Sequence, residues 1–192
     1  LVNPHRKQLQ GRTTFPSVSA IPEKIDHAYI MLSTVLVETA LNDCIAAGVA
    51  VVTVLADGFA DAGEVGRERQ ARLVAKADAA SMMMIGPNSM GVANTENGFI
   101  CTTNAAFRAD SLRHGRLAVL SHSGSLIGAL LSRGEARGIG FSKLISLGNE
   151  AQSCVGSVGM TMVKNTEIDG FVLFLETLRN CDTFATFAAA AK

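Results

Sequence analysis

The chain has 192 residues, 48% of them hydrophobic and 18% charged, and its formal net charge is zero. This apolar content argues against intrinsic disorder, and the length fits one domain or two small ones. The balanced charge gives no electrostatic footprint for nucleic acid or for an anionic membrane, so we expect small molecules and other proteins as partners. No apolar run approaches the roughly 18 residues that span a bilayer.

Four cysteines, Cys44, Cys101, Cys154 and Cys181, are spread along the chain. They form no C-x-x-C pair, and no histidine stands at metal-ligand spacing from them. A secreted domain held by disulfides would be shorter and richer in cysteine. We therefore predict buried free thiols in a reducing cytoplasm and no metal site.

Short apolar runs alternate with amphipathic stretches in the first half of the chain. We expect buried strands over residues 27–32, 49–55 and 82–85, and helices over residues 34–47 and 64–77. Gly48 is a good end for the first of these helices. A short extra strand is expected over residues 99–103.

A second series of the same kind follows a polar, charged segment at residues 110–115. Its expected elements are strands over 116–120, 141–147 and 170–175, and helices over 124–138, 155–165 and from Cys181 onward. Continuous apolar strands separated by helices predict parallel sheets with helices on both faces. We predict two domains, residues 1–112 and 113–192.

Both ends of the chain resemble cut ends. Leu1-Val2-Asn3-Pro4 resembles the end of a strand that runs into a turn, and residues 184–192 resemble an alanine-rich helix without a stop signal. We therefore expect a fragment of a longer protein.

Candidate site residues follow from the expected sheets, because open α/β sheets bind ligands beyond the carboxyl ends of their strands. The residues that directly follow expected strands are Ser33-Thr34, Ala56-Asp57-Gly58, Gly86 to Gly91, Ser121 to Ser125, Gly148 to Glu150, and Glu176.

Ser121-His122-Ser123-Gly124-Ser125 is the most informative of these segments, because it ends a strand and opens a helix. A helix N-terminus presents unpaired N–H groups and partial positive charge, which suit a phosphate. Glycine lets the backbone approach the anion, and hydroxyls add donors. The alternative, an ordinary serine N-cap, explains one serine but not three around a glycine.

Two further strand ends carry weaker signals. The loop Gly86 to Gly91 has glycines that permit close backbone approach, although a plain surface turn would use them too. Glu176 ends the apolar run 171–175, where a carboxylate can orient a histidine or bind a cation. The alternative for Glu176 is a solvated acid at the rim of a sheet.

An ordered set of motifs covers nearly the whole chain. The motifs are Val2-Asn3-Pro4, Phe15 to Val18, Ala56 to Gly63 with Gly66 to Glu68, Gly86 to Gly91, Ala118 to Gly124, Arg137 to Lys143, Ser146 to Ala151, and Leu173 to Glu176. Each motif alone is weak, but in this order they resemble the superfamily of NDP-forming acyl-CoA synthetases. That superfamily includes the succinyl-CoA synthetase α subunit and the ADP-forming acetyl-CoA synthetases.

The resemblance implies a fold and a reaction. The fold is a Rossmann-like CoA-binding domain followed by a flavodoxin-like domain. The reaction converts a carboxylic acid, ATP and CoA to acyl-CoA, ADP and phosphate through an acyl phosphate and a phosphohistidine. The implied partners are CoA, a small carboxylic acid, and an ATP-grasp domain or subunit that supplies ATP and Mg²⁺. We also expect an oligomer.

The resemblance also implies roles for individual residues. CoA would be lined by Val2, Asn3, Pro4, Ser33, Asp57, Gly58, Pro87 and Asn88. The helix start with Ser121, Ser123 and Gly124 would hold the phosphate of the phosphohistidine. Glu176 would hydrogen-bond that histidine's other ring nitrogen and fix its tautomer.

The chain lacks three segments of the family pattern. The first strand and the Gly-rich loop of the CoA-binding domain are absent, and so are the phosphohistidine and the ATP-grasp portion. The fragment alone is therefore expected to be inactive. Ser121-His122-Ser123-Gly124 is similar to the family's phosphohistidine motif, but its place after the first strand of its domain matches the phosphate-holding segment, where relatives carry Gln or Arg. His122 is therefore not expected to be phosphorylated.

The segment after Asn149-Glu150-Ala151 is another departure, since relatives continue with a more acidic helix. Gly156 and Gly159 fall within the helix expected here, at a cost of about 1 kcal/mol each relative to alanine. We interpret this as a surface altered for a particular partner or substrate, or as the mark of a diverged paralogue.

Two other functions stay open at this point. The same domains can serve as a non-catalytic, CoA-sensing regulatory module. A nucleotide-binding Rossmann protein such as a dehydrogenase is the other alternative, although no G-x-G-x-x-G follows a first strand in this chain.

Overall fold

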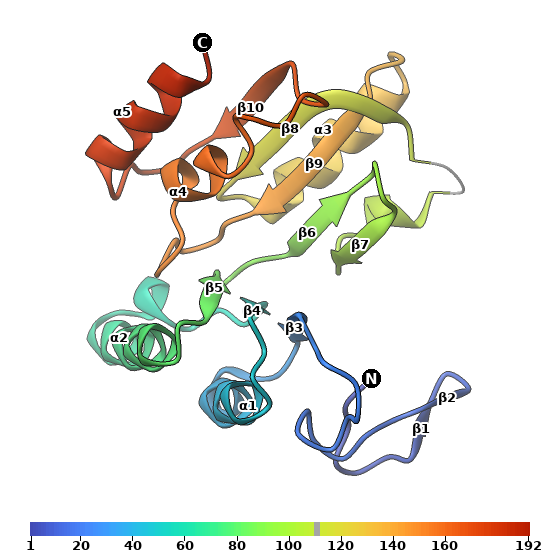
Figure 1. Cartoon of the computed structure of the whole chain (residues 1–192), viewed down its shortest axis with the longest axis vertical. Helices are drawn as coiled ribbons and strands as arrows, with labels where there is room; N and C mark the ends of the chain where they lie inside the picture. Colours follow the sequence, from blue (N-terminus) through green and yellow to red (C-terminus); the bar gives the residue numbers. More distant parts are fainter. Residues whose placement is uncertain (110–111) are drawn as a thin grey trace.

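The computed structural model describes residues 1–109 and 112–192 and contains two main sheets (Figure 1). The first has three parallel strands in the order β3 (His27–Ile30), β4 (Val51–Val54) and β5 (Met83–Ile85). Helices α1 (Thr34–Ala46) and α2 (Glu64–Ala79) connect them. These elements confirm the predicted strands and helices of the first half to within a few residues.

The second sheet has five strands in the order β10-β8-β9-β6-β7. Strands β8 (His114–Ser121), β9 (Phe141–Ser146) and β10 (Gly170–Phe174) are parallel, as predicted. The hairpin of β6 (Gly91–Asn94) and β7 (Phe99–Thr102) adds to β9 in antiparallel orientation, so the sheet is mixed. Strand β7 was predicted and β6 was not.

The hairpin of β6 and β7 precedes residue 112 but pairs with the strands that follow it. Sheet membership therefore changes between β5 and β6, whereas the predicted domain boundary falls between residues 112 and 113. That boundary stays a prediction. Within the polar segment that suggested it, residues 110 and 111 lie outside the described residues.

Helices cover the two sheets differently. In the five-stranded sheet, α3 (Gly124–Glu135) packs on one face, and α4 (Val155–Met160) and α5 (Cys181–Ala190) pack on the other. In the three-stranded sheet, α1 and α2 lie on the same side (Figure 1). The prediction of helices on both faces therefore holds for the second sheet only.

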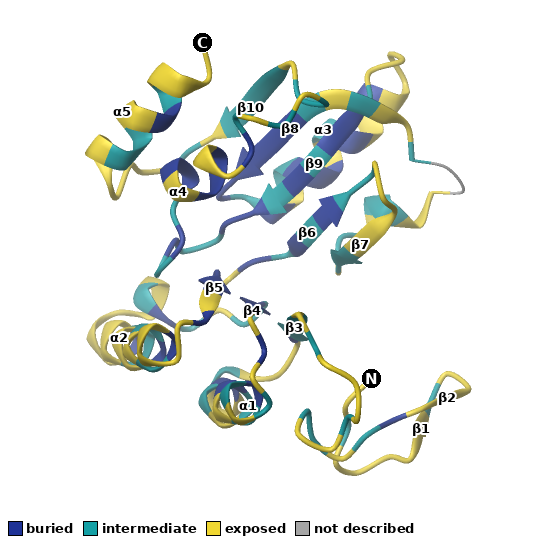
Figure 2. Cartoon of the chain, viewed as in Figure 1, coloured by how far each residue is buried: buried dark blue, intermediate teal, exposed yellow. Residues whose placement is uncertain are grey.

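Strand alternation explains how β8 contributes to two cores. Ala118 and Leu120 point into the cluster with α4 and α5, whereas Val119 points toward α3. All three side chains are buried, and Figure 2 shows the same dark band along β8 and β9. The three-stranded sheet has a separate core with α1 and α2.

Helix α4 is shorter than predicted, and its glycines have a packing role. A Cβ added to Gly156 would lie 2.6 Å from the backbone of Thr183, and one on Gly159 would lie 2.5 Å from the ring of Phe187. Both contacts are with α5, so the glycines allow the two helices to approach closely. The interpretation of this segment as an altered surface does not hold for these two glycines, because both are buried. It stays an interpretation for the exposed Ser157.

Smaller elements complete the described chain. A hairpin of β1 (Gln8–Leu9) and β2 (Arg12–Thr13) was not predicted, and short 3₁₀ helices cover Ala60–Ala62 and Ala105–Arg108. Among the described residues, no helix is both long and apolar enough to cross a membrane.

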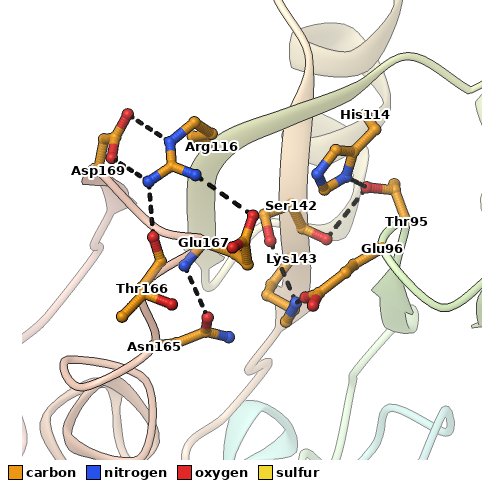
Figure 3. A network of polar contacts seen from close by, with 10 residues as sticks. All are labelled: Thr95, Glu96, His114, Arg116, Ser142, Lys143, Asn165, Thr166, Glu167 and Asp169. Carbon is orange, nitrogen blue, oxygen red and sulfur yellow. Dashed lines mark hydrogen bonds and ion pairs between the residues drawn. The ribbon is translucent and has the colours of Figure 1, made fainter.

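A polar network ties the amino ends of the parallel strands together, away from the carboxyl ends where ligands are expected (Figure 3). Arg116 on β8 donates to both carboxylate oxygens of Asp169, each at 2.7 Å, just before β10. His114 Nδ1 lies 3.1 Å from the hydroxyl of Thr95, which follows β6. Exposed ion pairs contribute little to the free energy of folding. We therefore expect this network mainly to fix the register of neighbouring strands.

We expect the four thiols to differ sharply in reactivity. Burial raises the pKa of Cys44 to about 11, and the carboxylate of Asp43 adds to the rise. Cys44 is 1% exposed, whereas Cys181 is exposed. Since the thiolate is the reactive form, iodoacetamide at neutral pH should modify Cys181 first and Cys44 only after unfolding, as read by peptide mass spectrometry. Equal labelling of both in the folded chain would contradict the packing of α1.

Candidate functional site

The carboxyl ends of the two sheets meet through the loop that follows β9. The backbone N–H of Asn149 donates to Pro87 O at 2.8 Å, and that of Ala151 donates to Gly86 O at 3.1 Å. The hydroxyl of Ser89 donates to Ser146 O at 2.5 Å. Loops that follow β5 and β9 are therefore in direct contact, although β5 and β9 belong to different sheets.

Asn149 also reaches the loop that follows β4. Its side-chain amide donates to Asp61 Oδ1 at 2.8 Å, and Asp61 in turn accepts the backbone N–H groups of Gly58 and Phe59. Burial opposes ionisation of Asp61, but the hydrogen bonds from Asn149, Gly58 and Phe59 outweigh it and lower its pKa. Asp61 thus links a predicted CoA-binding loop to the second sheet.

We expect Asn149→Ala to raise the pKa of Asp61 toward the ordinary value of 3.8. A lowered pKa in the folded state stabilises the fold above the unfolded value, and this contribution is lost as the pH falls through the folded value. The difference in unfolding free energy between the unsubstituted protein and the Asn149→Ala variant should therefore shrink below about pH 4. Carboxyl NMR titration of Asp61 and denaturant melts at each pH measure both effects, and an unchanged pKa in the variant would contradict the contact.

The predicted CoA residues after the three strands of the first sheet lie together. The hydroxyl of Thr34, next to Ser33, donates to Asp57 O at 2.8 Å. The N–H of Asn88 donates to Ala56 O at 2.8 Å, so the loop after β5 adjoins the loop after β4. Ser33, Asp57, Gly58, Pro87 and Asn88 thus share one rim, where Ser33, Asp57 and Asn88 are exposed.

The predicted CoA residues at the start of the chain stand slightly apart from that rim. Val2 and Pro4 line a cavity of about 360 Å³ along β3 that extends to Met31 and Leu32, the neighbours of Ser33. Asn3 instead caps its own turn, since its side-chain oxygen accepts the N–H groups of His5 and Arg6. Among the described residues, no hydrogen bond joins Asn3 to Ser33, Asp57, Gly58, Pro87 or Asn88.

Exposed apolar side chains flank the rim. Met31, Leu32, Val35 and Leu36 are 55%, 46%, 75% and 49% exposed. Side chains of this kind are usually buried, so together they form an exposed apolar patch beside the polar loops of the rim.

The segment predicted to hold phosphate has the expected local structure. Ser121 is the last residue of β8, and Ser123 is the N-cap of α3, where its hydroxyl accepts the N–H of Leu126 at 3.3 Å. The hydroxyl of Ser121 is buried and donates to Ser123 O at 2.7 Å. A Cβ on Gly124 would overlap the side chain of Met90, so glycine is required where α3 meets the loop before β6.

Glu176 lies beside this helix start. Phe174 at the end of β10 is in register with Ser121, and Glu176 follows two residues later with an exposed side chain. The structure therefore places the backbone of Glu176 next to the segment from Ser121 to Gly124, although Glu176 and His122 are 54 residues apart in the sequence.

A buried pair behind Glu176 was not predicted. His122 accepts the backbone N–H of Glu176 with Nδ1 at 3.0 Å, and its Nε2 lies 3.2 Å from Oε1 of Glu150. The two side chains are only 5% and 1% exposed. Glu150 was noted as a strand-end residue, but no sequence signal pairs it with His122.

Comparisons with known proteins match both halves of the chain. A CoA-binding domain model matches residues 1–95, and a succinyl-CoA ligase-like flavodoxin domain model matches residues 114–192. The ADP-forming acetate–CoA ligase I of Archaeoglobus fulgidus is 33% identical over 97% of this chain and 27% of its own length. The α subunit of Pyrococcus furiosus ADP-forming acetate–CoA ligase II is 30% identical over 97% of this chain and 40% of its own.

A solved structure shows the same fold. Acetyl-coenzyme A synthetase 1 of Candidatus Korarchaeum cryptofilum, in complex with phosphate and ADP, superposes with a TM-score of 0.90. It is 27% identical, and the match covers 99% of this chain and 40% of that one. The chain belongs to the NDP-forming acyl-CoA synthetase superfamily.

Each of the two domains matched to the NDP-forming acyl-CoA synthetases contains one part of the candidate site. The CoA-binding match contains the rim after β3, β4 and β5, and the flavodoxin match contains the α3 start and Glu176. The chain spans less than half the length of these synthetases. The contact between the two matched domains, through Asn149 and Asp61, is a feature that sequence reasoning missed, because no local pattern pairs an amide with a carboxylate so distant in sequence.

Proposed function

We propose that this chain is part of an enzyme that converts a carboxylic acid, ATP and CoA to acyl-CoA, ADP and phosphate. The observation that carries the proposal is the convergence of strand-end loops from both sheets at one junction. A rim suited to CoA and a helix start suited to phosphate adjoin each other there. An acid–thiol ligase that passes through an acyl phosphate needs these two sites to be neighbours.

Each part of the site has a specific task in this reaction. The rim formed by Ser33, Asp57, Gly58, Pro87 and Asn88, with the nearby Val2, Asn3 and Pro4, would bind CoA. The N-terminus of α3, with Ser121, Ser123 and Gly124, would stabilise a phosphoryl group through backbone N–H groups and the helix dipole. Glu176 would accept a hydrogen bond from the phosphohistidine ring and so fix its tautomer.

The remaining parts of the reaction belong to segments outside these 192 residues. ATP and Mg²⁺ would be bound by an ATP-grasp domain, fused or in a separate subunit, and the phosphorylated histidine would lie outside this chain. We also propose a cytoplasmic, oligomeric enzyme. The isolated chain should bind CoA weakly or not at all and should not turn over.

The proposal is tested by ADP release from the complete enzyme with ATP, Mg²⁺, CoA and a panel of carboxylic acids. ADP that depends on both acid and CoA establishes the ligase and identifies its acid. CoA binding without ADP release for any acid would instead support the regulatory module, which shares these domains. Binding of NAD without binding of CoA would support a dehydrogenase.

A further inference from the structure

The side chain of His122 adds one hydrogen bond beyond the end of the β8–β10 ladder. The regular ladder ends where Ser121 pairs with Phe174, and the backbone N–H of His122 still donates to Phe174 O at 3.0 Å. Beyond this point, the backbone N–H of Glu176 donates to His122 Nδ1 at 3.0 Å. A ring nitrogen thus takes the place of the next carbonyl and holds the main chain of Glu176.

This contact decides the tautomer of the ring. A nitrogen that accepts an N–H carries no proton, so neutral His122 must carry its proton on Nε2. Nε2 lies 3.2 Å from Oε1 of Glu150, close enough for electrostatic attraction, although the two atoms form no hydrogen bond. The buried carboxylate therefore favours the proton on Nε2, which leaves Nδ1 free to accept from Glu176.

Glu150 is itself held in place by the fold. Its backbone has φ of 48°, in the left-handed region, and its Oε1 accepts the N–H of Val155 at 2.5 Å. That residue is the first of α4. The pair of His122 and Glu150 therefore joins the loops that follow β8, β9 and β10 beneath one surface.

We propose that His122 and Glu150 are positioning residues that hold Glu176 at the phosphate-binding end of α3. This rests on the proposed function and adds to it a role for two side chains that do not touch substrate. Both ring nitrogens of His122 face protein groups, and the side chain is 5% exposed. The same geometry makes His122 a poor phosphoryl acceptor, because a phosphoryl group on Nδ1 would displace the backbone N–H of Glu176 and one on Nε2 would displace the buried carboxylate of Glu150.

The first test uses the complete enzyme and needs no activity. Nitrogen NMR of ring-labelled histidine, assigned by comparison with His122→Phe, should show His122 as the Nε2–H tautomer. Loss of one hydrogen bond of about 1 kcal/mol should make the Glu176 amide exchange about fivefold faster in His122→Phe. An Nδ1–H tautomer, or an amide whose exchange does not change, would overturn the proposal.

The second test uses kinetics of the complete enzyme. His122→Phe should lower kcat about tenfold without changing the KM for CoA, because misplacement of a catalytic group affects the transition state. His122→Asn should recover most of the rate, since its side-chain oxygen can accept the same N–H. His114→Phe is the matched control and should leave kcat unchanged, because His114 lies at the opposite end of β8.

A double-mutant cycle separates positioning through Glu176 from an independent role. In a Glu176→Gln background, His122→Phe should cause little further loss, because residues that act as a unit are not additive. Additive losses would contradict the proposal. If the complete enzyme forms no acyl-CoA at all, the proposed function fails, and the NMR test still decides whether His122 holds Glu176.

Discussion

Glu176→Gln in the complete enzyme is expected to lower kcat for acyl-CoA formation about 100-fold or more, the range for loss of an electrostatic or proton-binding group. Glutamine has the same shape but cannot match the charge of a carboxylate beside a phosphohistidine ring. The side chain is exposed, so the variant should fold normally. Rapid-quench measurement of phosphoenzyme formation and decay locates the affected step.

The control for this variant is Glu167→Gln, because Glu167 is also an exposed carboxylate but pairs with Arg116 at the amino end of the sheet. It should leave kcat unchanged. A Glu176→Gln enzyme that keeps its full rate would show that this strand-end acid is merely solvated. A rise in the KM for CoA with kcat unchanged would place Glu176 in binding and not in phosphoryl transfer.

Gly148→Ala is expected to destabilise the folded chain by about 3 kcal/mol or more, a large effect for one methyl group. Gly148 has φ of 58°, and an added Cβ would lie 2.2 Å from Pro87 O and 2.5 Å from Asn88 O. Backbone atoms cannot yield as a flexible side chain can. The loop after β9 would have to separate from the loop after β5.

Gly138→Ala is the matched control for this experiment. Gly138 also has positive φ, 71°, but nothing lies within 4 Å of an added Cβ. The Gly138→Ala substitution should therefore lower the free energy of unfolding by only about 1–2 kcal/mol, the cost of a left-handed backbone for a residue with a Cβ. Urea unfolding of both variants measures the difference. Equal destabilisation would mean that the two sheets do not meet at Gly148 in solution.

The parallel strands of both sheets were predictable because each is a short apolar run ended by glycine or polar residues. The same reasoning placed Ser123 at a helix start, since a serine between a strand and an amphipathic stretch is a local signal. The rim of Ser33, Asp57 and Asn88 followed from a general rule about the carboxyl ends of parallel strands. These inferences need only neighbouring residues.

Features that depend on contacts between distant segments were not predictable. Strand β6 belongs to the second sheet because it pairs with β9, and no local sequence pattern encodes this pairing. From the sequence, Gly156 and Gly159 predicted only a weak helix. The structure shows that glycine is needed at both positions because α5 packs closely against α4 there. His122 could be placed at the α3 start, but its burial against Glu150 depends on a loop whose path the sequence does not show.

We propose that this chain, within the complete enzyme, binds CoA and a phosphoryl group for an acid–thiol ligase whose phosphohistidine lies on another segment. The most direct measurement is transient labelling of the complete enzyme with radiolabelled ATP, followed by mapping of the labelled residue. We predict an acid-labile label on a histidine outside residues 1–192 that disappears when carboxylic acid and CoA are added together. Label on His122, or no phosphoenzyme under conditions where acyl-CoA forms, would contradict the account.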